Sequence, residues 1–169
     1  TFIYAWLYGA GDKKIGLIVG LRGDAAKARG KVLKKKFLKQ FPALGYLLSS
    51  VGKAVARKYV IGVDGRHIPI RSQHAALNTL LQGLGAAVMK TALVLLDERL
   101  QGELGLVPGS DYEFMLNIHD EWQIEAKPEL LELIGQAAVQ SIIKAGELLK
   151  LRCPLNGEYK IGQTWADTH

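Results

Sequence analysis

The stretch that most constrains this chain is residues 117–122, NIHDEW, which lies between two short apolar runs at residues 114–116 and 123–126. Three consecutive titratable side chains, those of His119, Asp120 and Glu121, are costly to bury in a core. The flanking runs are predicted strands, so the sequence favours a tight hairpin that exposes these side chains at its turn. Such a hairpin can present a carboxylate to a divalent metal ion. A polar turn without any ligand is the alternative, because short motifs often match by chance.

The composition indicates an ordinary globular protein. A length of 169 residues is enough for one domain or for part of a larger protein. The hydrophobic share of 49% and the charged share of 22% are compatible with a buried core. The net charge of +6 fits a negatively charged partner such as nucleic acid, although many enzymes are equally basic. The single cysteine, Cys153, excludes an internal disulfide and favours a reducing compartment.

The sequence indicates no membrane segment. We expect no apolar run to reach the roughly 18 residues that a membrane span needs. No secretory or transit signal is recognisable at the N-terminus, which predicts a cytoplasmic protein. The chain opens without methionine, in the middle of an apolar helical pattern, so we expect further residues upstream of Thr1.

The first part of the chain predicts four helices, at residues 2–8, 13–19, 24–40 and 42–58. Asp12 and Asp24 are the predicted caps of the second and third helices, and Pro42 is expected to begin the fourth. Residues 59–70 predict a hairpin, because Asp64-Gly65 lies between two β-branched runs.

Four lysines recur at intervals of four residues in the third predicted helix. They are Lys27, Lys31, Lys35 and Lys39. A solvated helix face is the commoner explanation of such a stripe. Attraction of phosphate groups is the alternative, and it would appear as salt-dependent binding.

The longest predicted helix covers residues 74–100, with Ser72 as its cap. His74, Asn78 and Gln82 lie on one stripe of this helix. A solvent-facing stripe is the commoner explanation, whereas a buried stripe would need a ligand, because unpaired amides are expensive to bury. A loop at residues 101–110, the hairpin described above, a covering helix at 128–149 and a short strand at 159–161 are expected to follow.

Three of these pieces, in this order and spacing, resemble family A DNA polymerases of the Pol I superfamily, especially the short replicative polymerases of podophages. TFIYAWLYG at residues 1–9 resembles the second half of the fingers helix. RSQHAALNTLLQ at residues 71–82 resembles the palm helix, and IHDE at residues 118–121 resembles the final catalytic motif. The ending WADTH at residues 165–169 is similar to the family's C-terminus. The resemblance covers essentially the whole chain.

The resemblance implies an α+β fold, with the C-terminal part of a fingers subdomain at residues 1–58 and of a palm subdomain at residues 59–169. The palm would contain part of an antiparallel sheet with covering helices. The implied activity is template-directed DNA synthesis, in which two Mg²⁺ ions assist nucleotidyl transfer to a primer 3′-hydroxyl. The implied partners are primer–template DNA, dNTPs and the upstream part of the polymerase, in the same chain or a separate one. The sequence identifies no processivity factor or replicative helicase. A phage enzyme would act in the cytoplasm of its bacterial host.

The resemblance also implies roles for individual residues. Asp120 would bind the catalytic metal ions, Glu121 would assist nearby, and His119 would lie at the primer terminus. Tyr4 would lie under the sugar and base of the incoming nucleotide, and Tyr8 beside the templating base. Relatives with tyrosine at the position of Tyr4 tend to accept sugars that lack a 3′-hydroxyl.

The expected DNA contacts come from the palm helix and the residue before it. His74, Asn78 and Gln82 would face the minor groove near the primer end, although many relatives have arginine in place of His74. Arg71 would contact a backbone phosphate.

The family's other catalytic aspartate, and the lysine and arginine that hold the triphosphate, should lie upstream of Thr1. No Asp or Glu within the 169 residues has a context that resembles that first motif. We therefore predict that this chain alone does not polymerise, whether it is a truncated, split or decayed polymerase. A non-catalytic DNA-binding module is one alternative. An unrelated metal-dependent hydrolase that uses residues 119–121 is another, although the sequence offers it no H-x-x-x-H motif or suitably spaced carboxylate pair.

Overall fold

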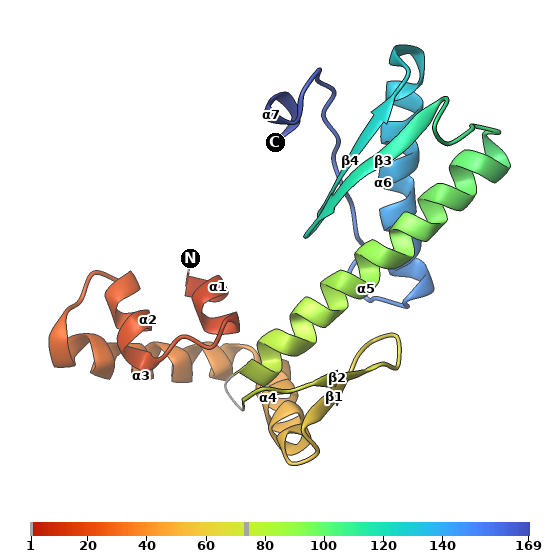
Figure 1. Ribbon diagram of the computed structural model, residues 1–169. Helices are drawn as coiled ribbons and strands as arrows, with labels where there is room; N and C mark the ends of the chain where they lie inside the picture. Colours follow the sequence, from red (N-terminus) through yellow and green to blue (C-terminus); the bar gives the residue numbers. More distant parts are fainter. Residues whose placement is uncertain (1, 73–74) are drawn as a thin grey trace. The chain divides into compact units, whose positions relative to one another are not determined.

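The computed structural model describes residues 2–72 and 75–169 and divides into two compact units, Thr1–Gly83 and Leu84–His169 (Figure 1). Each unit contains helices and a two-stranded antiparallel sheet, so the predicted α+β class is confirmed. The expected boundary between fingers and palm, at residues 58 and 59, remains a prediction. The first unit contains α1 (Phe2–Leu7), α2 (Asp12–Ile18), α3 (Gly23–Gln40), α4 (Pro42–Val55), β1 (Tyr59–Ile61), β2 (His67–Pro69) and the start of α5 (Ala76–Glu98). The second contains the rest of α5, η2 (Arg99–Glu103), β3 (Tyr112–Ile118), β4 (Glu121–Ala126), η3 (Pro128–Leu130), α6 (Leu131–Leu148) and α7 (Trp165–Thr168).

Helices α2 and α3 cross at two glycines. A Cβ atom on Gly16 would lie 1.8 Å from the carbonyl oxygen of Ala26, and one on Gly30 would lie 1.8 Å from that of Asp12. No side chain can be accommodated at such a separation, so the two backbones can meet here only because both residues are glycine. The close crossing accompanies the complete burial of Ile15.

The predicted caps of these two helices are wrong. The N-cap positions belong to Gly11 and Arg22, and neither side chain makes a capping hydrogen bond. Asp12 and Asp24 lie in the first turns instead, where a carboxylate still interacts favourably with the helix dipole. Asp12 also forms an ion pair with Lys34 of α3 at 3.2 Å, so contact between the helices replaces local capping.

Helix α1 is anchored through Trp6. This side chain is only 6% exposed, and its ring lies 5.1 Å from that of Phe37 on α3, at an interplanar angle of 65°. Phe2 makes a second edge-on contact with Phe37, at 5.3 Å. Leu77 of α5 belongs to the same buried cluster. Helices α1 and α3 and the first turns of α5 therefore share one core.

The first hairpin forms where Asp64-Gly65 predicts it, with shorter strands than expected. Val60 pairs with Ile68. Gly65 has a φ of +79°, which glycine adopts without strain. The turn extends outward to Gly62, whose amide donates to the carbonyl of Arg66 at 2.8 Å. Residues that were expected to extend the strands therefore form the turn.

The long helix α5 begins in the first unit and ends in the second. Ser72 Oγ accepts a hydrogen bond from the Ala75 amide at 3.3 Å, as expected of a residue that caps a helix. At its other end the helix continues as the π-helical segment Arg99–Glu103. The predicted loop therefore begins later than residue 101.

The second unit is built on the β3–β4 hairpin. Strands β3 and β4 are longer than predicted, and a β-bulge lies between Phe114 and Leu116. One face of the hairpin packs on α6 and on the end of α5 (Figure 1). Tyr112 and Ile134 are buried at this contact. The Tyr112 hydroxyl donates to Asp97 at 3.1 Å, and burial raises the pKa of the tyrosine.

The predicted strand at residues 159–161 is wrong, because this part of the described chain pairs with no strand. The Tyr159 ring lies against Gly135 of α6, so closely that a Cβ atom on the glycine would approach a ring carbon to 2.4 Å. Its hydroxyl donates to Glu132. Side-chain packing on α6 thus takes the place of strand pairing.

The expectation that no segment is long and apolar enough for a membrane span also needs correction. Ala76–Glu103 meets a length and hydropathy criterion, with a best mean hydropathy of 1.6 over an 18-residue window. This segment supplies buried side chains to the cores of both units, including Ala76, Leu77 and Leu96. Of the 18-residue window, 28% is buried, so packing in the two cores accounts for only part of its apolar composition.

Candidate active site

The turn of the β3–β4 hairpin consists of two residues. Ile118 pairs with Glu121, which leaves His119 and Asp120 to connect the strands. His119 has a φ of +55°, in the left-handed region that few residues other than glycine adopt. Strained backbone of this kind persists only where its surroundings hold it, and it is common at functional sites. The predicted hairpin is therefore present, and it exposes His119 and Asp120, whereas Glu121 is half-buried at the start of β4.

Asp120 is exposed and lines a cleft of about 1010 Å³ that belongs wholly to the second unit. Side chains from β4, α6 and the C-terminal segment complete its wall. Neither a hydrogen bond nor a salt bridge occupies the Asp120 carboxylate within the described residues. Its oxygens are thus available to a ligand.

Glu121 lies in a different environment from its neighbour. Its carboxylate accepts hydrogen bonds from Gln123 Nε2 and from Trp165 Nε1, the second at 2.9 Å, and His169 Nδ1 lies 3.1 Å away. These hydrogen bonds, led by that of Gln123 and followed by those of His169 and Trp165, hold the pKa of Glu121 below its usual value. Glu121 therefore joins the hairpin to α7.

Helix α7 is itself fixed by a capping box. Asp167 accepts hydrogen bonds from the backbone amide and the hydroxyl of Thr164, both at 2.8 Å. These contacts lower the pKa of Asp167, with the side-chain hydrogen bond as the largest cause. Neither Trp165 nor His169 was predicted to belong to this site. Their separation from Glu121 by 44 and 48 residues leaves no local signal that could have found them.

The predicted nucleotide-binding residues lie in the first unit, on and just after α1. Tyr4 is 71% exposed and Tyr8 60% exposed, in contrast to the buried Trp6 between them. The Tyr8 hydroxyl accepts a hydrogen bond from Gln82 Nε2 of α5 at 2.8 Å. Two residues that were singled out from distant parts of the sequence are thus brought together.

The other predicted DNA contacts lie on α5 or just before it. Asn78 is half-buried and Gln82 is exposed, one turn apart on the same stripe. Arg71 is exposed. His74 lies outside the described residues.

The described residues contain no group of three or more His, Cys, Asp or Glu side chains arranged to hold a metal ion. An unrelated hydrolase centre built on His119, Asp120 and Glu121 would need such a group. Asp120 alone suits a different kind of site, since Mg²⁺ is commonly held by one or two carboxylates together with phosphate oxygens and water. The described part of the chain therefore offers Asp120 as one candidate ligand for such an ion.

Comparison with known proteins places these features in a family. Residues 1–167 match DNA polymerase family A. The DNA-directed DNA polymerases of Enterobacteria phage T3 and Escherichia phage T7 are each 40% identical to this chain over 187 aligned residues. These alignments cover 100% of the chain and 26% of each relative, so the chain spans about a quarter of their length.

A solved structure supports the fold. The POL domain of Pol1 from M. smegmatis, in a complex with DNA primer-template and dNTP, has a TM-score of 0.68 to this chain. The match covers 84% of this chain and 26% of that one, at 22% sequence identity. Because the identity is so low, this similarity supports the fold alone. The family match covers nearly every residue, and on that basis the chain belongs to DNA polymerase family A.

Proposed function

We propose that this chain is the C-terminal part of the polymerising domain of a DNA-directed DNA polymerase, with residues 1–58 in its fingers and residues 59–169 in its palm. The enzyme would add dNTPs to a primer 3′-hydroxyl as a template strand directs. The observation that carries the proposal is the exposed Asp120 on a strained two-residue turn, in a chain of DNA polymerase family A. Similarity to phage enzymes favours the cytoplasm of an infected bacterium as its place of action.

Nucleotide addition is an in-line phosphoryl transfer, so catalysis depends on positioning and on stabilising charge at the transferring phosphate. Asp120 would supply one ligand to the catalytic ions. Two Mg²⁺ ions would stabilise the charge on the attacking and leaving oxygens. The exposed carboxylate fits this role because no other side chain among the described residues occupies it.

Glu121 and His119 would act beside Asp120 in different ways. Glu121 is held by Gln123 and Trp165, so it would fix the hairpin turn rather than bind a metal ion directly. The exposed ring of His119 would lie at the primer terminus. The strain at His119 would then serve to aim two adjacent side chains in defined directions.

The first unit would contribute the contacts to the base pair. Tyr4 would support the sugar and base of the incoming nucleotide, since an exposed aromatic ring can stack on any base. Tyr8, oriented by its hydrogen bond from Gln82, would lie beside the templating base. Asn78, Gln82 and His74 would face the minor groove, where every base pair presents acceptors at similar positions, and Arg71 would contact a backbone phosphate.

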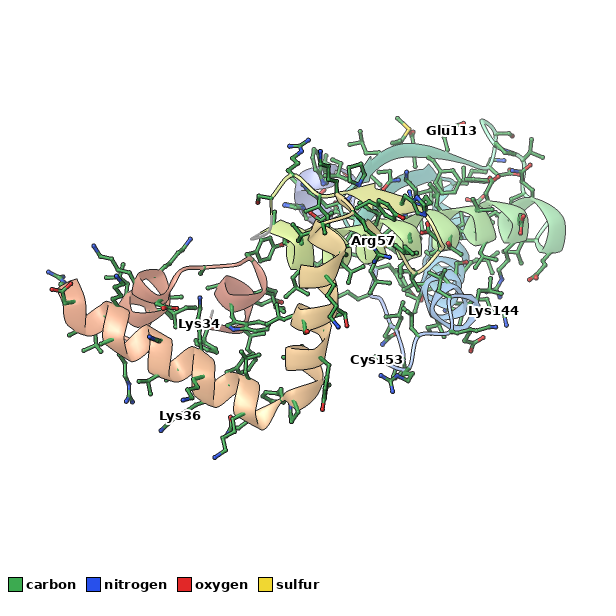
Figure 2. All side chains as sticks on the ribbon, turned by 90° about the horizontal axis from the view of Figure 1, so that it is seen from below. Lys34, Lys36, Arg57, Glu113, Lys144 and Cys153 are labelled. Carbon is green, nitrogen blue, oxygen red and sulfur yellow. The ribbon has the colours of Figure 1, made fainter. Side chains whose placement is uncertain are left out.

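The test uses a chimera in which residues 1–169 replace the matching part of the phage T7 polymerase. Asp120→Asn removes the charge of one ligand at almost constant volume, so primer extension should fall more than about 100-fold, because metal stabilisation of the transition state is worth several kcal/mol. Glu113→Gln on β3 is the matched control, because it removes an exposed carboxylate from the same hairpin (Figure 2). Full activity of the Asp120→Asn chimera would contradict the proposal.

A non-catalytic DNA-binding module is the second candidate. It is favoured by the charge of the first unit, in which 15 Lys and Arg stand against three Asp, a formal charge of +12. On this reading the chimera would not extend primers at all, whereas the 169-residue chain would bind duplex DNA equally well with and without Asp120→Asn. Extension by the unmodified chimera would exclude this candidate.

A further inference from the structure

The solvent-facing side of α3 carries a row of cations. Lys27, Lys31, Lys35 and Lys39, here called the lysine face, are all exposed. No salt bridge joins any of these four to an acidic side chain within the described residues. Lys34 differs, because it lies on the side of α3 that faces α2 and pairs with Asp12 (Figure 2).

This arrangement works against the stability of the helix. Like charges four residues apart repel each other in a helix, and the lysine face contains three successive pairs of this kind. Solvated helix faces usually mix both signs of charge, but α3 has no acidic residue after Asp24. A solvated face is therefore an incomplete explanation, and the pattern favours an anionic partner.

The charge of the two units supports the same conclusion. The first unit has a formal charge of +12, whereas the second, with seven Lys and Arg against 13 Asp and Glu, has a formal charge of −6. The net charge of +6 for the whole chain is therefore the sum of a strongly basic first unit and an acidic second unit. An extended field of one sign attracts polyanions.

The lysine face is separate from the tyrosines of the proposed insertion site. α1 packs on α3 through Trp6 and Phe37, and that contact occupies the buried side of α3. The lysine face runs from Lys27 to Lys39 on the opposite, exposed side, twelve residue steps that extend about 18 Å at the rise of an α-helix. That length can follow several consecutive phosphates of one strand.

Exposed aromatic rings lie at the end of this helix. Phe41, which follows α3 directly, is 50% exposed and packs one side of its ring against Phe37 at 5.0 Å between centroids. Tyr46 in the second turn of α4 is 76% exposed. Sites that combine cations with exposed aromatic side chains bind single strands, because unpaired bases can stack on the rings. A duplex would leave such rings without a stacking partner.

We propose that the lysine face of α3 binds the phosphate backbone of single-stranded DNA, with the exposed Tyr46 available to stack on its bases. If the proposed function holds, on which this identification rests, the strand is the unpaired template ahead of the base being copied. Binding itself requires no catalysis, so it can be measured on the 169-residue chain.

The test measures fluorescence anisotropy of a labelled oligo-dT and of a labelled duplex as salt is varied. In the test variant the four lysines of the lysine face become glutamine, which is also a good helix former. The control variant changes Lys53, Lys90, Lys144 and Lys160 to glutamine. All four control lysines are exposed, so both variants have the same formal charge of +2, the native +6 less four. Circular dichroism checks that each variant is folded.

Affinity of the test variant for oligo-dT should fall by at least about tenfold at moderate salt, and the slope of log K against log salt should decrease by about 3. The control variant should lose less than about threefold. Four Lys→Arg changes on the lysine face should retain binding, because the charge is kept.

Equal losses in the two glutamine variants would overturn the proposal, since net charge alone would then explain binding. A loss confined to duplex DNA would overturn the assignment to a single strand. Neither result depends on primer extension by the Asp120 chimera, so failure of this inference and failure of the proposed function can be told apart.

Discussion

At the scale of single residues, the backbone of His119 is the most informative feature. A non-glycine residue with a φ of +55° is strained, and the strain lies within a turn of only two residues. Asp120, the proposed metal ligand, is the other residue of that turn. The position of its carboxylate therefore depends on a backbone conformation that histidine tolerates but does not favour.

His119→Gly should relieve this strain, so the free energy of unfolding should stay constant or increase by up to about 1 kcal/mol. His119→Val should lower it by about 1–2 kcal/mol, because a β-branched side chain conflicts with a left-handed backbone. Urea denaturation of the 169-residue chain measures both. Equal destabilisation by glycine and valine would indicate that the side chain of His119, rather than its backbone conformation, supports the turn.

At the scale of elements, the crossing of α2 and α3 depends on the absence of two side chains. Gly16→Ala would place a Cβ atom 1.8 Å from the carbonyl oxygen of Ala26, so the helices would have to separate. We expect a loss of stability of about 1–3 kcal/mol or more, as for other overpacked sites, measured by thermal or urea denaturation.

Gly45→Ala is the control for this substitution, because nothing lies within 4 Å of the added Cβ atom and the residue is inside α4. Alanine is the better helix former there, so stability should rise by about 0.5–1 kcal/mol. A Gly16→Ala protein as stable as the native chain would show that the two helices do not need close backbone contact.

The attachment of α7 should depend on pH. The pKa of Asp167 is lowered in the folded chain, chiefly by its hydrogen bond from the Thr164 side chain. A depressed folded-state pKa contributes stability that is present above the ordinary value of 3.8 and is lost as pH falls through the folded-state pKa. Acidification below about pH 4 should therefore loosen α7.

The fluorescence of Trp165, obtained by difference from a Trp165→Phe chain, reports this loosening. Asp167→Asn should weaken the capping box already at neutral pH and reduce the acid transition of this signal to the part that comes from Glu121, which accepts a hydrogen bond from Trp165. A transition that is unchanged in the Asp167→Asn chain would assign the pH dependence to another group.

At the scale of the whole molecule, the proposed function assigns this chain one of the two aspartates that the complete enzyme would need. The described residues offer no cluster of three potential metal ligands, and no other Asp or Glu of the sequence resembles the family's first motif. The purified 169-residue chain should therefore fail to extend a primer at any Mg²⁺ concentration. Template-dependent extension by this chain, measured on a labelled primer, would refute that expectation.

Elements that depend on local chemistry could be predicted from the order of residues alone. Asp64-Gly65 predicted the first hairpin because a tight turn needs a residue that tolerates positive φ, and Pro42 marked the start of α4. A turn at residues 119–121 was predicted because polar side chains between apolar strands must remain in solvent. The structure keeps His119 and Asp120 in the turn and places Glu121 in β4. The resemblance to the family rested on the order and spacing of three sequence motifs. These can be read from the sequence without any knowledge of the folded structure.

Only the tertiary structure decided which side chains meet. Glu121 and Asp120 are adjacent in sequence, yet within the described ranges only Glu121 is held, by Trp165 of α7 and by His169 directly after it. Asp12 pairs with Lys34 instead of capping α2, and Tyr159 packs on Gly135 instead of joining a sheet. Local propensity reflects the φ and ψ preferences of single residues. The contacts named here form only when packing brings two distant parts of the chain within hydrogen-bond or van der Waals distance.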